Sequence, residues 1–323
     1  MNTSSGHWFA VASSRELTER PLGKTRFGQR LVFWRDQNGV VRCLRDQCAH
    51  RGAKLSLGKL CAGRIECPFH GLQFDGAGKC LRVPAEGDDW TIPDRLRVPA
   101  YQVTERDGYV WLWRGPGRAD EQLPAPPELN LVEGLEYGET KSIWNAHYTR
   151  CIENVIDFSH IQFVHRNTLG RLIPDPITRL SVQAKDWGFQ ARQIRGNRFP
   201  EQFIEFLYPN LWFDHMNKTH VNAATFVPID DKTTEVYVRR YHNVRLPILR
   251  QSLEMLSRFG AFVIFRDDWP IVSSQLPMNV DDASTDSLLP SDACIVAYRK
   301  LRHQYQVQGI ESNGVASAAE ETG

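Results

Sequence analysis

Residues 46–75 read DQCAHRGAKLSLGKLCAGRIECPFHGLQFD, which contains C-x-H, sixteen further residues and then C-x-x-H. The four potential metal donors are Cys48, His50, Cys67 and His70. Two thiols and two imidazoles suit either zinc or an iron–sulfur cluster, because both accept mixed sulfur and nitrogen ligands. Common zinc fingers pair Cys with Cys and His with His, whereas each half here pairs one Cys with one His. A cluster with two Cys on one iron and two His on the other needs this split.

The sequence around this stretch predicts a small, mostly antiparallel β domain. Gly52 and Gly71 follow the two halves of the motif and would allow two tight loops to close around a cluster. Turn signals such as QNG, DGAGK and ERDG separate short β-type segments. The segments are RLVFWRD (30–36), VVRCLRD (40–46) and GYVWLWRG (108–115).

The second half of the chain has the pattern of an α+β domain. A proline-rich stretch, GPGRADEQLPAPPELN (115–130), separates it from the β segments and reads as an extended linker. We expect helices around residues 148–166 and 247–275, flanking an antiparallel sheet. The alternating runs for that sheet include FIEFLYP (203–209), NAATFVPI (222–229) and EVYVRRYHNV (235–244).

A second group of potential ligands lies in CIENVIDFSHIQFVHRN (151–167), which contains D-x-x-H-x-x-x-x-H. On a regular helix Asp157 and His160 are about 60° apart and share a face. His160 and His165 would diverge by about 140°, so both reach one metal only if the helix is distorted or ends between them. Two histidines and one carboxylate form a facial triad that leaves positions open on Fe(II). The segment FRDDWPIVSSQLP offers Asp267 and Asp268, of which only one can serve because adjacent residues point in different directions.

Composition limits the classes of protein that the chain can represent. Its 323 residues suffice for two domains, and 39 basic against 38 acidic residues give no broad attraction to nucleic acid or anionic lipid. No apolar run approaches the roughly 20 residues that cross a bilayer, and the first residues lack a secretory leader pattern. Seven scattered cysteines favour metal binding over a disulfide framework. We therefore expect a cytoplasmic protein that binds neither nucleic acid nor membrane.

The segments CAHRG and CPFHG resemble the Rieske [2Fe–2S] domain of aromatic ring-hydroxylating oxygenases. To about residue 305 the chain is similar to the oxygenase (alpha) subunit of the Rieske mononuclear non-haem iron family. It is most similar to dicamba and vanillate monooxygenase-like members and, through PSDACIVAYRK, to saxitoxin-pathway hydroxylase-like members. In HGLQFD, Leu72 replaces the family's usual Trp, so we expect altered packing beside the cluster but not its loss.

The resemblance implies a domain organisation and a set of site residues. It predicts an all-β Rieske domain over residues 1–115, an α+β helix-grip catalytic domain over 116–308 and a disordered tail over 309–323. It assigns the cluster to Cys48, His50, Cys67 and His70. It assigns the mononuclear Fe(II) to His160, His165 and Asp268, with Asp267 as the alternative. Its catalytic residues are Asn154 and Asp157, the latter bridging to His70 of a neighbouring subunit.

The family's chemistry predicts the reaction and the partners. O2 and electrons would hydroxylate or oxidatively demethylate a small ring-containing substrate, with a cis-dihydroxylating dioxygenase as the alternative. The chain shows no G-x-G-x-x-G fingerprint, so NAD(P)H would act through a separate flavin reductase, with or without a ferredoxin. A homotrimer is implied, in which electrons pass from one subunit's cluster to the neighbour's iron. Competing hypotheses are a structural-zinc module fused to a lipid-binding helix-grip domain, and a Rieske ferredoxin with an extension.

Substrate contacts are expected on the predicted sheet. Candidate pocket residues are Leu207, Trp212, Asp214, Thr225 and Arg240. Because successive side chains of a strand alternate between its two faces, about half of such a set would lie outside a pocket. The sequence alone does not identify the substrate.

Overall fold

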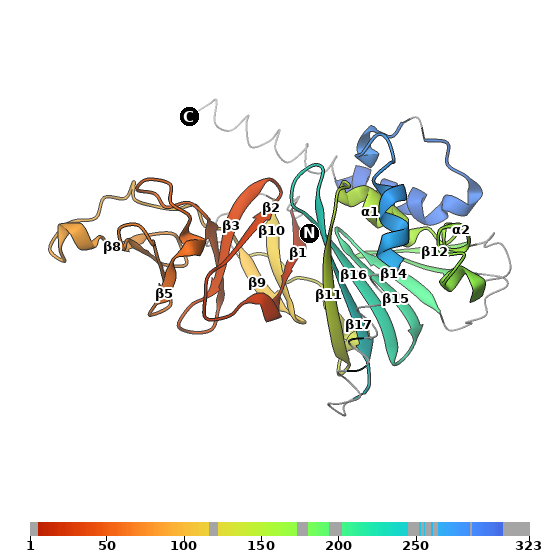
Figure 1. The fold of residues 1–323 in the computed structure, drawn as a ribbon, viewed down its shortest axis with the longest axis horizontal. Helices are drawn as coiled ribbons and strands as arrows, with labels where there is room; N and C mark the ends of the chain where they lie inside the picture. The colour runs from red at the N-terminus through yellow and green to blue at the C-terminus, as the bar shows by residue number, and fades with distance from the viewer. Residues whose placement is uncertain are drawn as a thin grey trace. The chain divides into compact units, whose positions relative to one another are not determined.

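The structure is a computed structural model that describes residues 6–115, 122–172, 180–193, 202–244, 264–284 and 286–305, together with residues 252, 255 and 260. The chain forms two compact units, Met1–Glu128 and Leu129–Gly323 (Figure 1). The division falls within the proline-rich stretch 115–130. The predicted tail, 309–323, lies outside the described residues.

The first unit consists of small antiparallel sheets, as the sequence predicts. Sheets of three, three and four strands have the orders β1-β10-β9, β2-β3-β4 and β5-β6-β7-β8. Their strands are β1 His7–Ser13, β2 Leu22–Arg26, β3 Gln29–Arg35, β4 Val41–Arg45, β5 Lys59–Cys61, β6 Arg64–Glu66, β7 Gln73–Phe74, β8 Cys80–Arg82, β9 Val103–Arg106 and β10 Tyr109–Arg114. All three strand segments predicted here, 30–36, 40–46 and 108–115, are confirmed.

The core of this unit reaches the Cys-His loops. Val32 and Trp34 of β3 pack with Leu44 of β4, and the same cluster of buried residues includes Cys48 and Cys67. Continuous apolar runs such as LVFW therefore form strands buried on both faces, where no polar alternation is required. The core fixes the backbone from which both loops project.

The second unit is built on a seven-stranded antiparallel sheet of order β11-β17-β16-β15-β14-β13-β12. The strands are β11 Glu136–Trp144, β12 Leu180–Lys185, β13 Gly188–Gln193, β14 Phe203–Leu207, β15 Leu211–Asn217, β16 His220–Pro228 and β17 Thr234–His242. The predicted runs 203–209, 222–229 and 235–244 correspond to β14, β16 and β17. From β12 to β17, neighbours in the sheet are also neighbours in sequence and pair antiparallel, and β11 pairs with β17.

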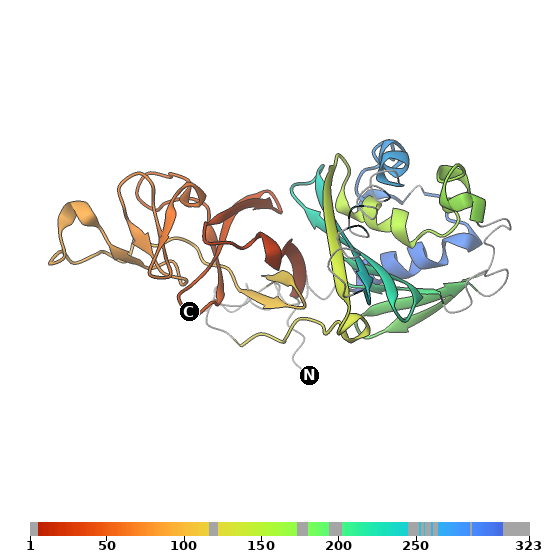
Figure 2. The same ribbon diagram turned by 60° about the horizontal axis from the view of Figure 1, so that its bottom comes forward.

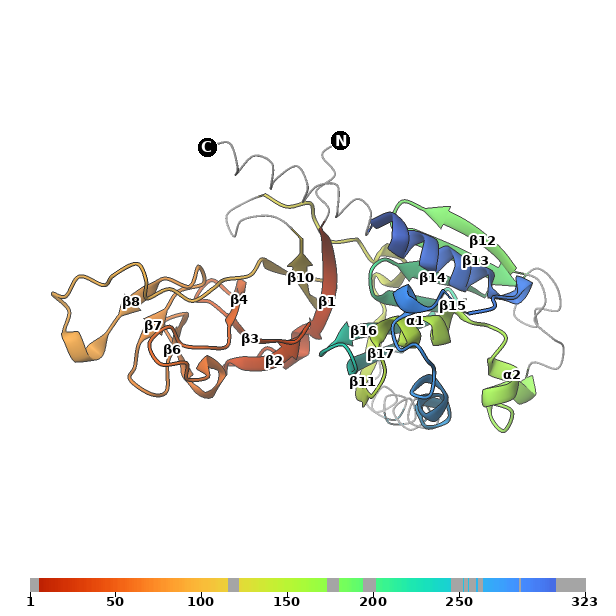
Figure 3. The same cartoon turned by 90° about the horizontal axis from the view of Figure 1, so that it is seen from above.

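Helices cover one face of this sheet (Figure 2). They are α1 Tyr148–Ile156, α2 Ile161–Val164 and the helical residues 264–272 and 293–305. Phe265 packs edge-on against Trp144 of β11, while Tyr298 packs edge-on against Phe206 of β14. Helix 293–305 thus crosses the β14 side of the sheet and helix 264–272 the β11 side (Figure 3). The core between the layers includes Cys151, Ile152, Ile156, Phe189, Phe226, Val236, Val272 and Cys294.

The predicted single helix over 148–166 is wrong beyond Ile156. Asp157 caps α1 with an extended backbone, φ −84° and ψ 113°. Its carboxylate accepts hydrogen bonds from the backbone N–H and the hydroxyl of Ser159, at 2.7 and 2.5 Å. Such a local bond gives the backbone an alternative to the helix, so the chain turns before the four-residue α2 begins. Of the predicted helix 247–275, residues 264–272 are helical and much of the rest lies outside the described residues. Among the described helices, none is both long and apolar enough to cross a bilayer.

Candidate metal centres

Two loops of the first unit, Cys48–Ala53 and Cys67–Leu72, have the same backbone hydrogen bonds. In each loop the Cys amide donates to the carbonyl five residues later, and the glycine amide donates back to the Cys carbonyl. The two distances are 2.8 and 2.9 Å in the first loop and 2.8 and 3.1 Å in the second. Gly52 and Gly71 both have φ +73°, a left-handed conformation that side chains disfavour. The glycines therefore close both loops, as the sequence predicts.

The donors of these loops are arranged in two pairs. Cys48 and Cys67 are buried, and the imidazole rings of His50 and His70 lie 4.8 Å apart between centroids. Burial, reinforced by the adjacent Cys67 thiol, raises the pKa of Cys48 to about 11. A metal that binds this thiol would have to displace its proton, as thiolate-binding metals do.

The paired arrangement fits a cluster better than one zinc ion. A zinc site brings its four donors around a single point. Among the described residues, only His160, His165 and Asp268 form a group of three or more His, Cys, Asp or Glu donors within 4.8 Å of one another. The first unit therefore offers a Cys pair and a His pair instead, which is the donor set of a [2Fe–2S] cluster with one all-Cys and one all-His iron. Cys43, Cys61 and Cys80 are free thiols outside this set.

The His side of these loops faces the surface. His50 is exposed, His70 is half-buried and the neighbouring Phe69 ring is 56% exposed. Leu72, in the position of the family's usual Trp, is 3% exposed and packs in the core cluster that contains both cysteines. The departure from the motif is accommodated by this apolar packing.

The second unit brings together His160, His165 and Asp268. Nε2 of His165 lies 3.1 Å from Oδ1 of Asp268, and Nε2 of His160 lies 3.6 Å from the same oxygen. His160 and His165 occupy the two ends of α2, and Asp268 comes from helix 264–272. Because α1 ends before His160 and α2 is only four residues long, both imidazoles reach one point, which a regular helix would not allow.

A backbone hydrogen bond orients His160. Its Nδ1 lies 2.7 Å from the carbonyl oxygen of Asp157, which can only accept, so Nδ1 carries the proton. Nε2 then presents its lone pair towards Asp268. A hydrogen bond to the other ring nitrogen commonly orients a metal-bound histidine in this way. Although the spacing puts Asp157 and His160 on one helix face, the Asp157 carboxylate lies 3.8 Å from Nδ1 and accepts a hydrogen bond from Ser159 instead.

The electrostatics of the triad suit a cation. Burial lowers the pKa of His160 below its ordinary value despite the nearby Asp268 and Asp157 carboxylates. Burial also lowers the pKa of His165, but Asp268 and Asp267 outweigh it and raise the value. Oδ1 of Asp268 is buried and has no hydrogen-bond partner among the described residues. Since an unsatisfied buried carboxylate oxygen is costly, a metal ion at this point would satisfy all three side chains.

Asp267 lies beside His165, on the side of the ring that faces away from Asp268. Its Oδ2 lies 3.9 Å from Nδ1 of His165, the ring nitrogen that faces away from Asp268, and its Oδ1 is paired with Arg266. This placement makes Asp267 an outer partner of His165 and leaves Asp268 as the carboxylate that lies between the two imidazoles.

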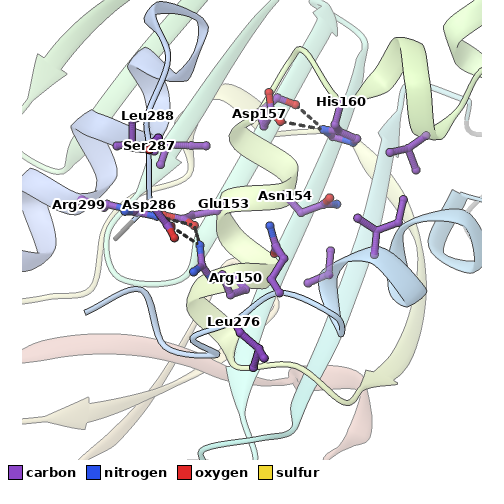
Figure 4. Close-up of a pocket in the computed structure, with 15 residues that line it drawn as sticks. Arg150, Glu153, Asn154, Asp157, His160, Leu276, Asp286, Ser287, Leu288 and Arg299 are labelled. Atoms are coloured by element: carbon purple, nitrogen blue, oxygen red, sulfur yellow. Dashed lines mark hydrogen bonds and ion pairs between the residues drawn. The ribbon is translucent and has the colours of Figure 1, made fainter. Parts of the chain in front are cut away.

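A cavity of about 430 Å³ adjoins His160. Asn154 and Asp157 of the α1 region line it together with His160, as Figure 4 shows. Ile271, Val272 and Leu276 supply apolar lining from the segment that follows Asp268. The structure thus brings the predicted residues Asn154, Asp157 and His160 to one cavity.

Four charged residues that sequence reasoning missed line the same cavity. Arg150 and Arg299 bind Glu153 and Asp286 in a closed network with distances of 2.7 to 2.9 Å (Figure 4). Arg150 also donates to the carbonyl oxygen of Pro277. The i,i+3 spacing of Arg150 and Glu153 is the one signal in the sequence that could have indicated this network.

Comparison with protein families matches both units. Residues 7–102 match the Rieske [2Fe–2S] domain, and residues 144–223 match the vanillate O-demethylase oxygenase C-terminal domain. The first match contains the Cys-His loops, and the second contains α1 and α2 with both histidines of the triad.

Curated relatives are similar to parts of the chain. The oxygenase component of dicamba O-demethylase from Stenotrophomonas maltophilia is 38% identical over 166 residues, 49% of this chain and 47% of that protein. The vanillate O-demethylase oxygenase subunit of a Pseudomonas species is 30% identical over 169 residues, 51% and 46% of the two chains. The 4beta-methylsterol monooxygenase of Methylococcus capsulatus is 28% identical over 293 residues, 83% and 76% of the two chains. The chain spans about half the length of the dicamba and vanillate relatives it matches.

Solved structures show the same fold over nearly the whole chain. Dicamba monooxygenase bound to 3,6-dichlorosalicylic acid superimposes with a TM-score of 0.75 at 24% identity, covering 94% of this chain and 97% of that one. NdmA of Pseudomonas putida CBB5 gives a TM-score of 0.76 at 24% identity, covering 94% and 91%. The predicted fold class is confirmed. The chain thus combines a match to the Rieske [2Fe–2S] domain with a match to the C-terminal domain of vanillate O-demethylase oxygenase, in the fold of the dicamba monooxygenase and NdmA structures.

Proposed function

We propose that the chain is a terminal oxygenase component that uses O2 and externally supplied electrons to monooxygenate a small organic substrate. One observation carries the proposal: each unit holds its own donor set, Cys and His pairs in the first and a His-His-Asp triad in the second. An electron carrier alone would need only the first set, and a lipid-binding domain would need neither. Two separate sets are what electron storage followed by O2 chemistry requires.

The proposed ligands are Cys48, His50, Cys67 and His70 for the cluster and His160, His165 and Asp268 for a mononuclear iron. A triad of this kind leaves neighbouring coordination positions open to O2 and substrate, which is the chemistry that the iron supplies when bound. The protein's own contribution is orientation. The Asp157 carbonyl fixes the tautomer of His160, and the Asp267 carboxylate lies behind His165. Asn154 presents an amide to the cavity beside His160, where it would position a polar group of the reactants.

Electrons would enter through a partner protein, a flavin reductase with or without a ferredoxin, that draws on NAD(P)H. We further propose a homotrimer in which the cluster of one subunit serves the iron of the next. The exposed His50 and half-buried His70 support this, because their surface position allows another chain to reach the cluster. In the neighbouring subunit, the Asp157 carboxylate would accept a hydrogen bond from His70.

The reaction we favour is hydroxylation or oxidative demethylation. One oxygen atom enters the substrate and the other leaves as water, which consumes two electrons and two protons. A hydroxylated methoxy group then loses formaldehyde to leave a phenol. The relatives named as O-demethylases and monooxygenases support this choice over cis-dihydroxylation. A cytoplasmic location is consistent with seven free cysteines and no disulfide.

A single-turnover experiment tests the function. The iron-loaded protein is reduced with dithionite, freed of excess reductant and exposed to O2 with a library of small ring compounds. We expect mass spectrometry to detect a product heavier by one oxygen atom or lighter by a methylene unit. The Asp268→Ala variant with an intact cluster is the matched control and should give none. Equal product from the variant would contradict the proposal, as would cluster oxidation without product for every compound of a broad library.

A further inference from the structure

Three polar side chains form a row on the helix-covered face of the second unit's sheet. Asp214 of β15 is paired in register with Asn222 of β16, which is paired in turn with Arg240 of β17. Two residues earlier, Trp212 of β15 and Val238 of β17 pack into the core beneath the helices. Because side chains alternate along a strand, the three polar residues share that face. We call Asp214, Asn222 and Arg240 the polar row.

One end of the polar row is satisfied internally. The carboxylate of Asp214 accepts hydrogen bonds from the side-chain amides of Gln202, at 2.9 Å, and Asn222, at 3.2 Å. Burial raises the pKa of Asp214 above its ordinary value. This carboxylate therefore has partners of its own, and no ion pair joins it to Arg240 two strands away.

The other end has no partner. The Arg240 guanidinium forms no hydrogen bond or ion pair with any residue that the structure describes, and burial lowers its pKa. Gly260 lies directly against it, since a Cβ added at Gly260 would stand 3.3 and 3.4 Å from the two Nη atoms. A partly buried cation without a counterion is costly, and proteins usually pair such groups.

Three other arginines of the same unit are paired with carboxylates. The adjacent Arg239 points to the opposite face of the sheet and donates to Glu139 at 2.7 Å. Arg150 and Arg299 share Glu153 at 2.9 and 2.7 Å. Arg240 departs from this pattern on the face that the helices cover.

We propose that Arg240 binds a carboxylate group of the substrate, so that the compound oxidised is a small organic anion. This inference rests on the proposed function and names its substrate class. A guanidinium presents its N–H groups in a planar fork that matches a carboxylate with two hydrogen bonds. Asn222, paired beside Arg240, contributes a neutral amide to the same place.

Arg240 lies on the face of the sheet against which helix 264–272, the helix that carries Asp268, packs. Gly260, which lies beside the guanidinium, precedes Asp268 by eight residues in the sequence. Trp212, on the same face, has a buried indole N–H with no hydrogen-bond partner among the described residues. A substrate anchored by its carboxylate at Arg240 could satisfy this donor with a second polar group. Two fixed points would hold the remaining carbon framework in one orientation.

Calorimetric titration of the full-length, iron-loaded protein tests the inference without turnover. The test compounds are 4-methoxybenzoate and 4-methoxybenzamide, which share their ring and size but differ in charge. We expect wild type to bind the benzoate about tenfold or more tightly than the amide, because a charge-assisted hydrogen bond contributes more than a neutral one. Arg240→Gln should abolish that preference. Arg240→Lys should keep part of it, because lysine keeps the positive charge but lacks the planar N–H groups that form two hydrogen bonds with a carboxylate.

Arg192→Gln is the matched control. This arginine lies over Phe203 on the opposite face, so its replacement removes the same charge without touching the polar row. We expect its preference for the benzoate to equal that of wild type. Equal affinity of wild type for the two compounds, or an undiminished preference in Arg240→Gln, would overturn the inference.

The outcome is separable from that of the proposed function. Oxidation of 4-methoxybenzoate at equal rates by wild type and Arg240→Gln would contradict the carboxylate site while leaving the oxygenase intact. Circular dichroism and iron content of Arg240→Gln establish that the variant is folded. If it does not fold, Arg240→Lys decides: a preference for the benzoate as large as that of wild type would contradict the proposal.

Discussion

Nδ1 of His160 donates its hydrogen bond to the backbone carbonyl of Asp157, at 2.7 Å, and not to the carboxylate of the same residue. The orientation of His160 therefore depends on the main chain at the end of α1. The Asp157 carboxylate is held by Ser159 and lines the cavity beside His160. The two roles of Asp157, orienting a metal ligand and presenting a charge, are separable by substitution.

Asp157→Asn should leave metal binding intact while impairing electron transfer. The carbonyl bond to His160 is unaffected, and the new amide oxygen can still accept from Ser159, so iron content should not change. Loss of the charge that we assign to the inter-subunit link should lower coupled oxidation by about 100-fold, the upper range for outer-shell partners of metal sites. Iron analysis, dithionite reduction of the cluster and steady-state turnover measure the three quantities. Near-normal turnover at full iron occupancy would remove Asp157 from the electron path.

Arg150→Met should destabilise the second unit. The Arg150 and Glu153 side chains are each only 5% exposed, and Arg150 also holds the Pro277 carbonyl. Breaking a buried pair leaves an uncompensated charge, which costs about 3 kcal/mol of unfolding free energy. Lys141→Met, whose ion pair with Glu235 is 4.0 Å long and half exposed, is the control and should cost at most about 1 kcal/mol. Urea unfolding measures both, and equal effects would contradict a structural role for the network.

Asp286→Asn should change the response to acid. Burial raises the pKa of Asp286, but hydrogen bonds from Arg150 and Arg299 outweigh it and hold the pKa below its ordinary value. The unfolded chain thus binds more protons than the folded one near pH 4, so this carboxylate stabilises the fold above that pH and ceases to do so as pH falls through its folded pKa. The stability difference between wild type and variant should be largest at neutral pH and shrink below about pH 4. A difference that is constant or grows on acidification would contradict this.

Leu72→Ala should loosen the packing around the Cys-His loops. Leu72 is 3% exposed and packs with Cys48 and Cys67, so truncation leaves a cavity that costs about 3 kcal/mol. The backbone bond from Cys67 to residue 72 remains, so the cluster's absorption should survive at low temperature and disappear at a lower melting temperature. Leu57→Ala, at a side chain that is 72% exposed, should change neither.

Much of the fold was predictable because it depends on local patterns. Continuous or alternating apolar runs bounded by turn residues identified β3, β10, β14 and β17, and the Cys-His spacing with Gly52 and Gly71 indicated the two loops. These features are encoded within a few residues of one another. The class of fold then followed from the order of strands and helices.

The details of the triad were not predictable from spacing. Helical periodicity extended α1 through residue 166, because a hydrogen bond between Asp157 and Ser159 competes with the helix without altering the apolar pattern. The partnership of Arg150 with Asp286 joins residues 136 positions apart, and no local rule indicates it. Of the five expected pocket residues, Leu207 and Thr225 fall on the face opposite Trp212, Asp214 and Arg240, because a strand alternates and the sequence does not say which face the helices cover.

Metal and sulfide analysis of wild type, Asp268→Ala and Asp267→Ala is the most direct measurement. We predict about three irons and two acid-labile sulfides per chain in wild type, since the two donor sets are separate. Asp268→Ala should lose one iron and keep both sulfides and the cluster's absorption, whereas Asp267→Ala should keep most of the third iron because its carboxylate lies behind His165. Zinc without labile sulfide in wild type, or three irons retained by Asp268→Ala, would contradict the assignment of two iron centres to this chain.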